Sequence, residues 1–230
     1  GWPSLQFVVA GDARMAWRYP LDRTWRRCTG AVLACALLAP AAPAAAAILI
    51  DLSGVDTGSA AMARFRAYVD SAVAGARPYA FSATDAAYAW RLVGNPAYCQ
   101  LAVALAEEQV AAAEREIAAG QRAPVASDSY LEVGDFSRDL SITYDWCASF
   151  TTASQRTRWA AYAEQAVWNV WNPAQARWGT GSFPWSGWSI NDPGNNYHFS
   201  FLEATMYWSL ASNSSTWRTF LDNQKFPPLM

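Results

Sequence analysis

Apolar residues recur at intervals of three and four over most of the chain, which is the spacing of amphipathic α-helices. The first such run covers residues 59–76, where the apolar positions are Met62, Phe65, Val69, Ala72 and Val73. A second helix is expected over 86–93, with Thr84 or Asp85 able to cap its start. A third follows over 96–120 and completes a helical hairpin with the second.

Three further helices are predicted after a polar connection over 121–135. The fourth carries apolar residues on one side, the fifth ends before Pro173, and the sixth runs from a cap at Asn195 or Asn196 to about Ser212. No segment shows the alternation of apolar and polar residues that indicates a β-strand. The sequence therefore predicts an all-α protein.

Successive antiparallel helix pairs with short connections favour an (α/α) toroid, which is a ring of helical hairpins. Closing such a ring takes roughly ten to twelve helices of ordinary length, about twice the number that this sequence predicts. We expect residues 47–230 to form an incomplete toroid of antiparallel hairpins that is truncated at its C-terminus. The natural protein is expected to continue past Met230.

The first 46 residues have a different pattern, which predicts upstream residues followed by a secretory signal peptide. Met15 opens a basic segment, an apolar run covers 31–38, and a tract of small residues covers 40–47. The apolar run is far shorter than the roughly 20 residues of a membrane helix, so no permanent membrane span is predicted. The expected location is secreted or periplasmic, with a lipid anchor on Cys35 as the weaker alternative.

Charge and cysteine content narrow the range of partners. Five of the 17 basic residues and two of the 19 acidic residues precede Ala47, which leaves a net charge of about −5 after it. Nucleic acid is excluded as a partner because its recognition needs a basic face. The remaining cysteines, Cys99 and Cys147, either pair in an oxidising compartment or stay as buried thiols. No cysteine or histidine spacing indicates a metal site.

A long segment without helical periodicity, residues 172–196, interleaves glycine and proline with aromatic residues. Loops of more than about 12–15 residues in compact domains are usually functional or disordered, and the aromatic content argues against disorder. Tryptophan provides a flat apolar face with one N–H donor, which suits stacking on sugar rings. Trp178, Trp185 and Trp188 are therefore candidate substrate-binding residues, with plugging of one end of the helical ring as the alternative.

The one histidine of the chain, His198, lies beside Asn195, Asn196 and Tyr197 at the start of the sixth predicted helix. Unpaired N–H groups and the helix dipole favour an anion at this end of a helix. His198 and one asparagine would hydrogen-bond a uronate carboxylate there and stabilise the enolate-like anion that forms when C5 loses its proton. In the alternative, one asparagine only caps the helix and His198 is a hydrogen-bonded wall residue.

Three short groups of residues between Gly134 and Ser212 match a known class of enzymes. They are Leu140, Thr143, Tyr144, Asp145 and Trp146, then Thr152, Gln155 and Arg156, then Asn195, Asn196, Tyr197 and His198. With these groups the stretch resembles the N-terminal part of the helical-toroid polysaccharide lyases of the alginate lyase and heparinase II/III superfamily. The spacing differs from the commonest form in that class, because Tyr197 separates Asn196 from His198.

The resemblance implies a lyase that cleaves a uronate-containing polysaccharide by β-elimination without a cofactor. Its partner would be an acidic polysaccharide or oligosaccharide. By the same resemblance Asn195 or Asn196 would neutralise the carboxylate, and His198 would be the neutraliser or the base. The class also uses a tyrosine that often lies farther along the chain, which would leave this chain inactive by itself. Within it, Tyr144 and Tyr197 are the candidates, Tyr144 also as a substrate-binding residue.

Two other functions remain open from the sequence. A glycoside hydrolase on a similar helical toroid would need two carboxylates about 5 to 10 Å apart, for which Asp145, Asp192 and Glu203 are available. A non-catalytic carbohydrate-binding protein would use the same tryptophan-rich loop. Substitution of His198 separates these functions, because only the lyase depends on it for turnover.

Overall fold

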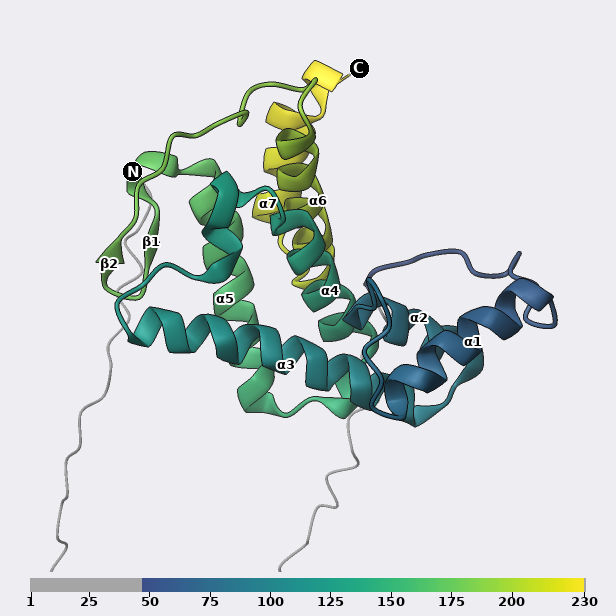
Figure 1. The fold of residues 1–230 in the computed structure, drawn as a ribbon. Helices are drawn as coiled ribbons and strands as arrows, with labels where there is room; N and C mark the ends of the chain where they lie inside the picture. The colour runs from purple at the N-terminus through teal and green to yellow at the C-terminus, as the bar shows by residue number, and fades with distance from the viewer. Residues whose placement is uncertain (1–46, 230) are drawn as a thin grey trace, which may run out of the picture. The chain divides into compact units, whose positions relative to one another are not determined.

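The computed structural model describes residues 47–229, and this part of the chain is predominantly helical (Figure 1). The all-α class predicted from the sequence is thereby confirmed. The predicted signal peptide lies outside the described residues. The α-helices are α1 Ala60–Val73, α2 Ala83–Val93, α3 Pro96–Ala118, α4 Val133–Trp146, α5 Ala153–Trp171, α6 Asn196–Ala211 and α7 Ser215–Phe220. Short helical turns lie between or after these helices, at Pro124–Tyr130, Ala148–Phe150, Pro173–Gln175, Leu221–Lys225 and Pro227–Leu229.

Local signals explain most of the helix starts. Thr152 caps α5 and exchanges hydrogen bonds with Gln155, and Asn195 caps α6 by accepting the Tyr197 N–H. The cap of α2 differs from the prediction, because Ser82 holds that position. The Asp85 carboxylate instead accepts the Ser82 N–H from the third helical position.

Two elements were missed by the sequence analysis. Helix α7 has only six residues, too few to show a period. A small antiparallel hairpin also forms inside the loop, where β1 Arg177–Trp178 pairs with β2 Gly181–Ser182. Its two-residue turn begins at Gly179, whose φ of 56° suits glycine better than other residues.

The helices pack in an alternating order. Helix α4 lies between α2 and α6, and α3 and α5 pack against this row and against each other. The three helices of the row run parallel, because a residue farther along one helix meets a residue farther along the next. The contacts that show this are Thr84 with Asp139, Tyr88 with Trp146, Gly134 with Ser200, and Tyr144 with Trp208. Consequently α2, α4 and α6 point the same way, with the start of α2 beside the middle of α4.

A disulfide bond joins α3 to the residue that follows α4. Cys99 and Cys147 are both fully buried, with Cα atoms 5.4 Å apart. Of the two states left open by the sequence, the structure therefore has the paired one. The bond lies inside the main hydrophobic core, next to Trp146.

Helices α4 and α6 approach so closely that Gly134 leaves no room for a side chain. A Cβ atom there would lie 2.9 Å from the Ser200 carbonyl oxygen and 2.8 Å from a carboxylate oxygen of Glu203. Gly134→Ala should therefore lower the free energy of unfolding by about 1–3 kcal/mol, although alanine is the better helix former. Urea denaturation measures the change.

The matched control is Glu108→Ala, on the exposed side of α3, which should change stability by less than about 0.5 kcal/mol. If Gly134→Ala were as stable as the control, the two helices would have to separate without cost, and the close approach would not be a stabilising feature.

Candidate functional site

His198 lies in the first turn of α6 and is almost completely buried, with 2% of its surface exposed. Its Nδ1 is 3.1 Å from the Ser189 carbonyl oxygen. A carbonyl oxygen only accepts, so Nδ1 carries a hydrogen, and in the neutral tautomer that this contact selects the lone pair lies on Nε2. Among the described residues Nε2 has no hydrogen-bond partner. The ring therefore has a fixed orientation, with Nε2 buried and unpartnered.

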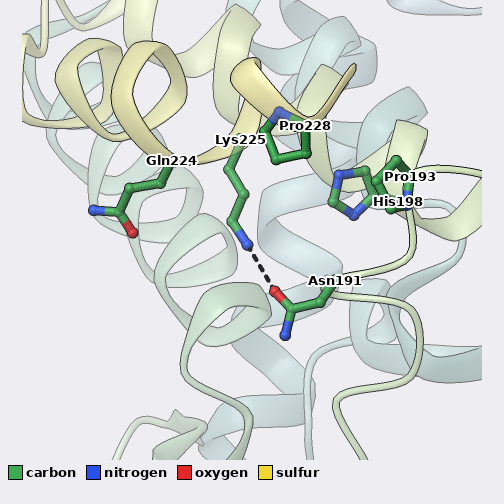
Figure 2. A pocket seen from close by; sticks show the side chains of 6 residues that line it. All are labelled: Asn191, Pro193, His198, Gln224, Lys225 and Pro228. Atoms are coloured by element: carbon green, nitrogen blue, oxygen red, sulfur yellow. Dashed lines mark hydrogen bonds between the residues drawn. The ribbon is translucent and has the colours of Figure 1, made fainter. Parts of the chain in front are cut away.

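His198 lines a pocket of about 100 Å³ between the end of the loop and the C-terminal turns (Figure 2). The lining residues are Asn191, Pro193, His198, Gln224, Lys225 and Pro228. A cavity of about 10–15 Å³ holds one water molecule, whereas sites that enclose whole ligands measure about 300–1,000 Å³. The pocket is thus large enough for a carboxylate group and too small for a sugar ring.

Lys225 brings a positive charge to the same pocket. Its Nζ donates to the Ile190 carbonyl oxygen at 3.1 Å and to Asn191 Oδ1 at 3.2 Å, the bond drawn dashed in Figure 2. It also lies 4.2 Å from the ring centroid of Trp171, a cation–π contact. Burial lowers the pKa of Lys225. An ammonium has three donors and two are used, so one remains for an anion.

The other three residues of the Asn-Asn-Tyr-His run do not line the pocket and have different partners. Asn195 Oδ1 accepts the Tyr197 N–H at 3.0 Å, and Asn196 is exposed. The Tyr197 hydroxyl donates to Asp128 Oδ1 at 3.1 Å. Partial desolvation and this neighbouring carboxylate raise the pKa of Tyr197, which makes its phenolate harder to form.

The three tryptophans of the loop differ in exposure. Trp178 is 2% exposed and packs near Tyr162, so its ring offers no face to a ligand. Trp185 is half-buried and donates its indole N–H to the Asn169 carbonyl oxygen. Trp188 is 57% exposed and directly precedes the residue whose carbonyl orients His198. It is the one of the three with a face available for a sugar.

Tyr144 lies away from the pocket. Its ring lies under the Arg156 guanidinium at 3.7 Å and meets the edge of Trp208. Trp208 follows His198 by ten residues on α6, which is about 15 Å along the helix. The structure therefore does not bring Tyr144 together with His198.

Each acid available for hydrolysis has a partner elsewhere. The Asp145 carboxylate accepts two backbone N–H groups, Asp192 accepts the Gly194 N–H, and Glu203 forms an ion pair with Arg138 at 2.8 Å. None of the three lines the pocket at His198. A pair of carboxylates facing a common substrate is not formed by these residues.

The sequence analysis found His198 and missed Lys225 and Asn191. Lys225 lies in a segment without a motif and Asn191 in the long loop over 172–196, and only the packing of the C-terminal turns against this loop brings both to His198. No group of histidine, cysteine and acidic side chains in the described part of the chain has the arrangement of a metal site. None of the helices between Ala47 and Leu229 is long and apolar enough to cross a membrane.

Comparison of the chain with protein-family models, with curated proteins and with solved structures finds no match. The functional assignment rests on the site itself.

Proposed function

We propose that this chain is part of a secreted polysaccharide lyase that cleaves a uronate-containing polysaccharide by β-elimination. The observation that carries the proposal is the buried, unpartnered Nε2 of His198, a residue that lines a pocket together with Lys225. β-Elimination from a uronate needs a base for the C5 proton and a positive group for the carboxylate. This pocket offers both.

The reaction would proceed with His198 as the base. Nε2 takes the proton from C5, the electron pair forms the C4–C5 double bond, and the C4–O bond to the next sugar breaks. The departing oxygen takes up a proton from water, and Nε2 later returns the C5 proton to water. The remaining N–H of Lys225 and the positive end of α6 stabilise the negative charge that spreads onto the carboxylate, which lowers the barrier to proton removal.

The size of the pocket sets how the substrate would bind. The carboxylate and the C5–H beside it would enter, and the rest of the sugar ring would lie at the mouth. Trp188 provides an exposed face, one residue before Ser189, for stacking on such a ring. Asn195, whose side-chain NH₂ is not used in capping, would add a donor at the same end of α6.

The architecture supports the toroid part of the proposal. In an (α/α) toroid alternate helices form an inner and an outer layer, and α2, α4 and α6 form one such row, against which α3 and α5 pack. The helices of the row run parallel, and the starts of α4 and α6 lie side by side, where His198 is found.

The disulfide supports the proposed location. Disulfides form and persist in oxidising compartments and are rare in the cytosol. The Cys99–Cys147 bond therefore fits a protein that is secreted or periplasmic.

Incubation with alginate, heparan sulfate, chondroitin and hyaluronan tests the proposal through the ultraviolet absorbance of unsaturated uronates. We expect the absorbance to rise with one of these polymers, at the least in a longer parent protein that contains this chain. New reducing ends without absorbance would indicate hydrolysis instead. Binding without either signal would indicate a carbohydrate-binding protein, and both results would overturn the lyase assignment.

A further inference from the structure

Residues Ala47 and Ile48 are held at the end of α4 by two neighbouring side chains. The Ala47 N–H donates to Asp145 Oδ1 at 3.0 Å, and the Ile48 N–H donates to Asp145 Oδ2 at 2.7 Å. The Ile48 side chain is 2% exposed, and its carbonyl oxygen accepts the Trp146 indole N–H at 2.9 Å. Three hydrogen bonds and a buried side chain thus fix this pair of residues.

The Asp145 carboxylate has no cationic partner in the part of the chain between Ala47 and Leu229. The ion pairs of these residues join Arg138 or Arg158 to other acids. Asp145 is half-buried. A partly buried carboxylate without a counter-ion carries a desolvation cost, which an added positive charge within hydrogen-bond distance would offset.

We propose that the mature protein begins at Ala47 and that its new α-ammonium group forms an ion pair with Asp145. A peptidase would hydrolyse the Ala46–Ala47 bond. The water oxygen becomes part of the Ala46 carboxylate, and the Ala47 nitrogen leaves as an amine and takes up a proton. The nitrogen already lies 3.0 Å from Oδ1, so the charged group forms its bond without movement of the chain.

The contacts select this position among several that the sequence allows. Residues 41–47 include overlapping Ala-x-Ala patterns, each of which fits the small-residue rule of signal cleavage. A cut one residue later would remove the amide that binds Oδ1. A cut one or more residues earlier would place the charge on a nitrogen other than the two that bind Asp145. Only a chain that starts at Ala47 keeps both bonds and places the charge on the carboxylate.

The first arm of the test is the N-terminus of the exported protein. The full chain is produced in a bacterium that exports it, and intact-mass and N-terminal sequence analysis identify the first residue. We expect Ala47. Any other start, or retention of the preceding residues, would overturn the proposal. This result does not depend on whether the protein is a lyase.

The second arm measures the ion pair on the same exported protein. An amine-selective acylating reagent near neutral pH should modify the α-amino group about two- to fivefold faster in Asp145→Asn than in the unchanged protein, because the carboxylate keeps the amine protonated. Asp51→Asn is the matched control, since Asp51 is exposed and binds its own Ser53 N–H. Equal rates in all three proteins would contradict the pair. Circular dichroism verifies that Asp145→Asn is folded.

Discussion

Replacing His198 by Gln should lower the turnover of a uronate polymer by about 10²–10⁴-fold in a form of the protein that is active. Gln is close to His in size, and its amide group can still donate to the Ser189 carbonyl oxygen. It has no basic nitrogen, so the C5 proton would have no acceptor. The rate of appearance of the unsaturated product, measured against substrate concentration, gives kcat and KM separately.

The expected change lies in kcat, with KM within a few-fold of its original value, because Trp188 and Lys225 are unchanged. Gln100→Ala, an exposed substitution on α3 far along the chain from the site, is the control and should retain full activity. An active enzyme that keeps most of its turnover after His198→Gln would exclude His198 as the base. A rise in KM alone would assign it to substrate binding.

The helices were predictable because each buries one face, and a buried face leaves a period of three to four in the sequence. That signal located α1 through α6 to within a few residues. The prediction failed for elements that are too short to show a period or that depend on one of several neighbouring residues. Helix α7 is shorter than two turns, and the cap of α2 had three neighbouring candidates, Ser82, Thr84 and Asp85, of which only the three-dimensional geometry selects one.

The candidate site was predictable only in part. His198 stood out because the chain has a single histidine, and its position at a helix start has a clear chemical meaning. Lys225 has no such context, because it reaches the pocket through the fold of the last turns. The exposure of the loop tryptophans could not be predicted from the sequence either. Trp178 and Trp188 each stand beside a glycine in the same loop, yet Trp178 lies in the core and Trp188 faces solvent.

Removing the disulfide should destabilise the protein more than the crowding at Gly134→Ala does. The bond closes a segment with a sequence separation of 48 residues, from α3 to the end of α4. The chain-entropy relation gives about 4 kcal/mol for a loop of this length, and measured values are typically about 2–4 kcal/mol. The double variant Cys99→Ala with Cys147→Ala should therefore lose about 2–4 kcal/mol of unfolding free energy, out of a total of about 5–15 kcal/mol.

Urea denaturation with and without a reducing agent measures this loss. The reducing agent should lower the midpoint of the unchanged protein and leave the midpoint of the double variant where it is. Without the disulfide, Ala47 and Ile48 should also be held less firmly. Cys147 directly follows Asp145 and Trp146, whose side chains bind these two residues. Acylation of the α-amino group should then become faster in the double variant as well. A midpoint that does not respond to the reducing agent would show that the bond constrains the unfolded chain less than its loop length predicts.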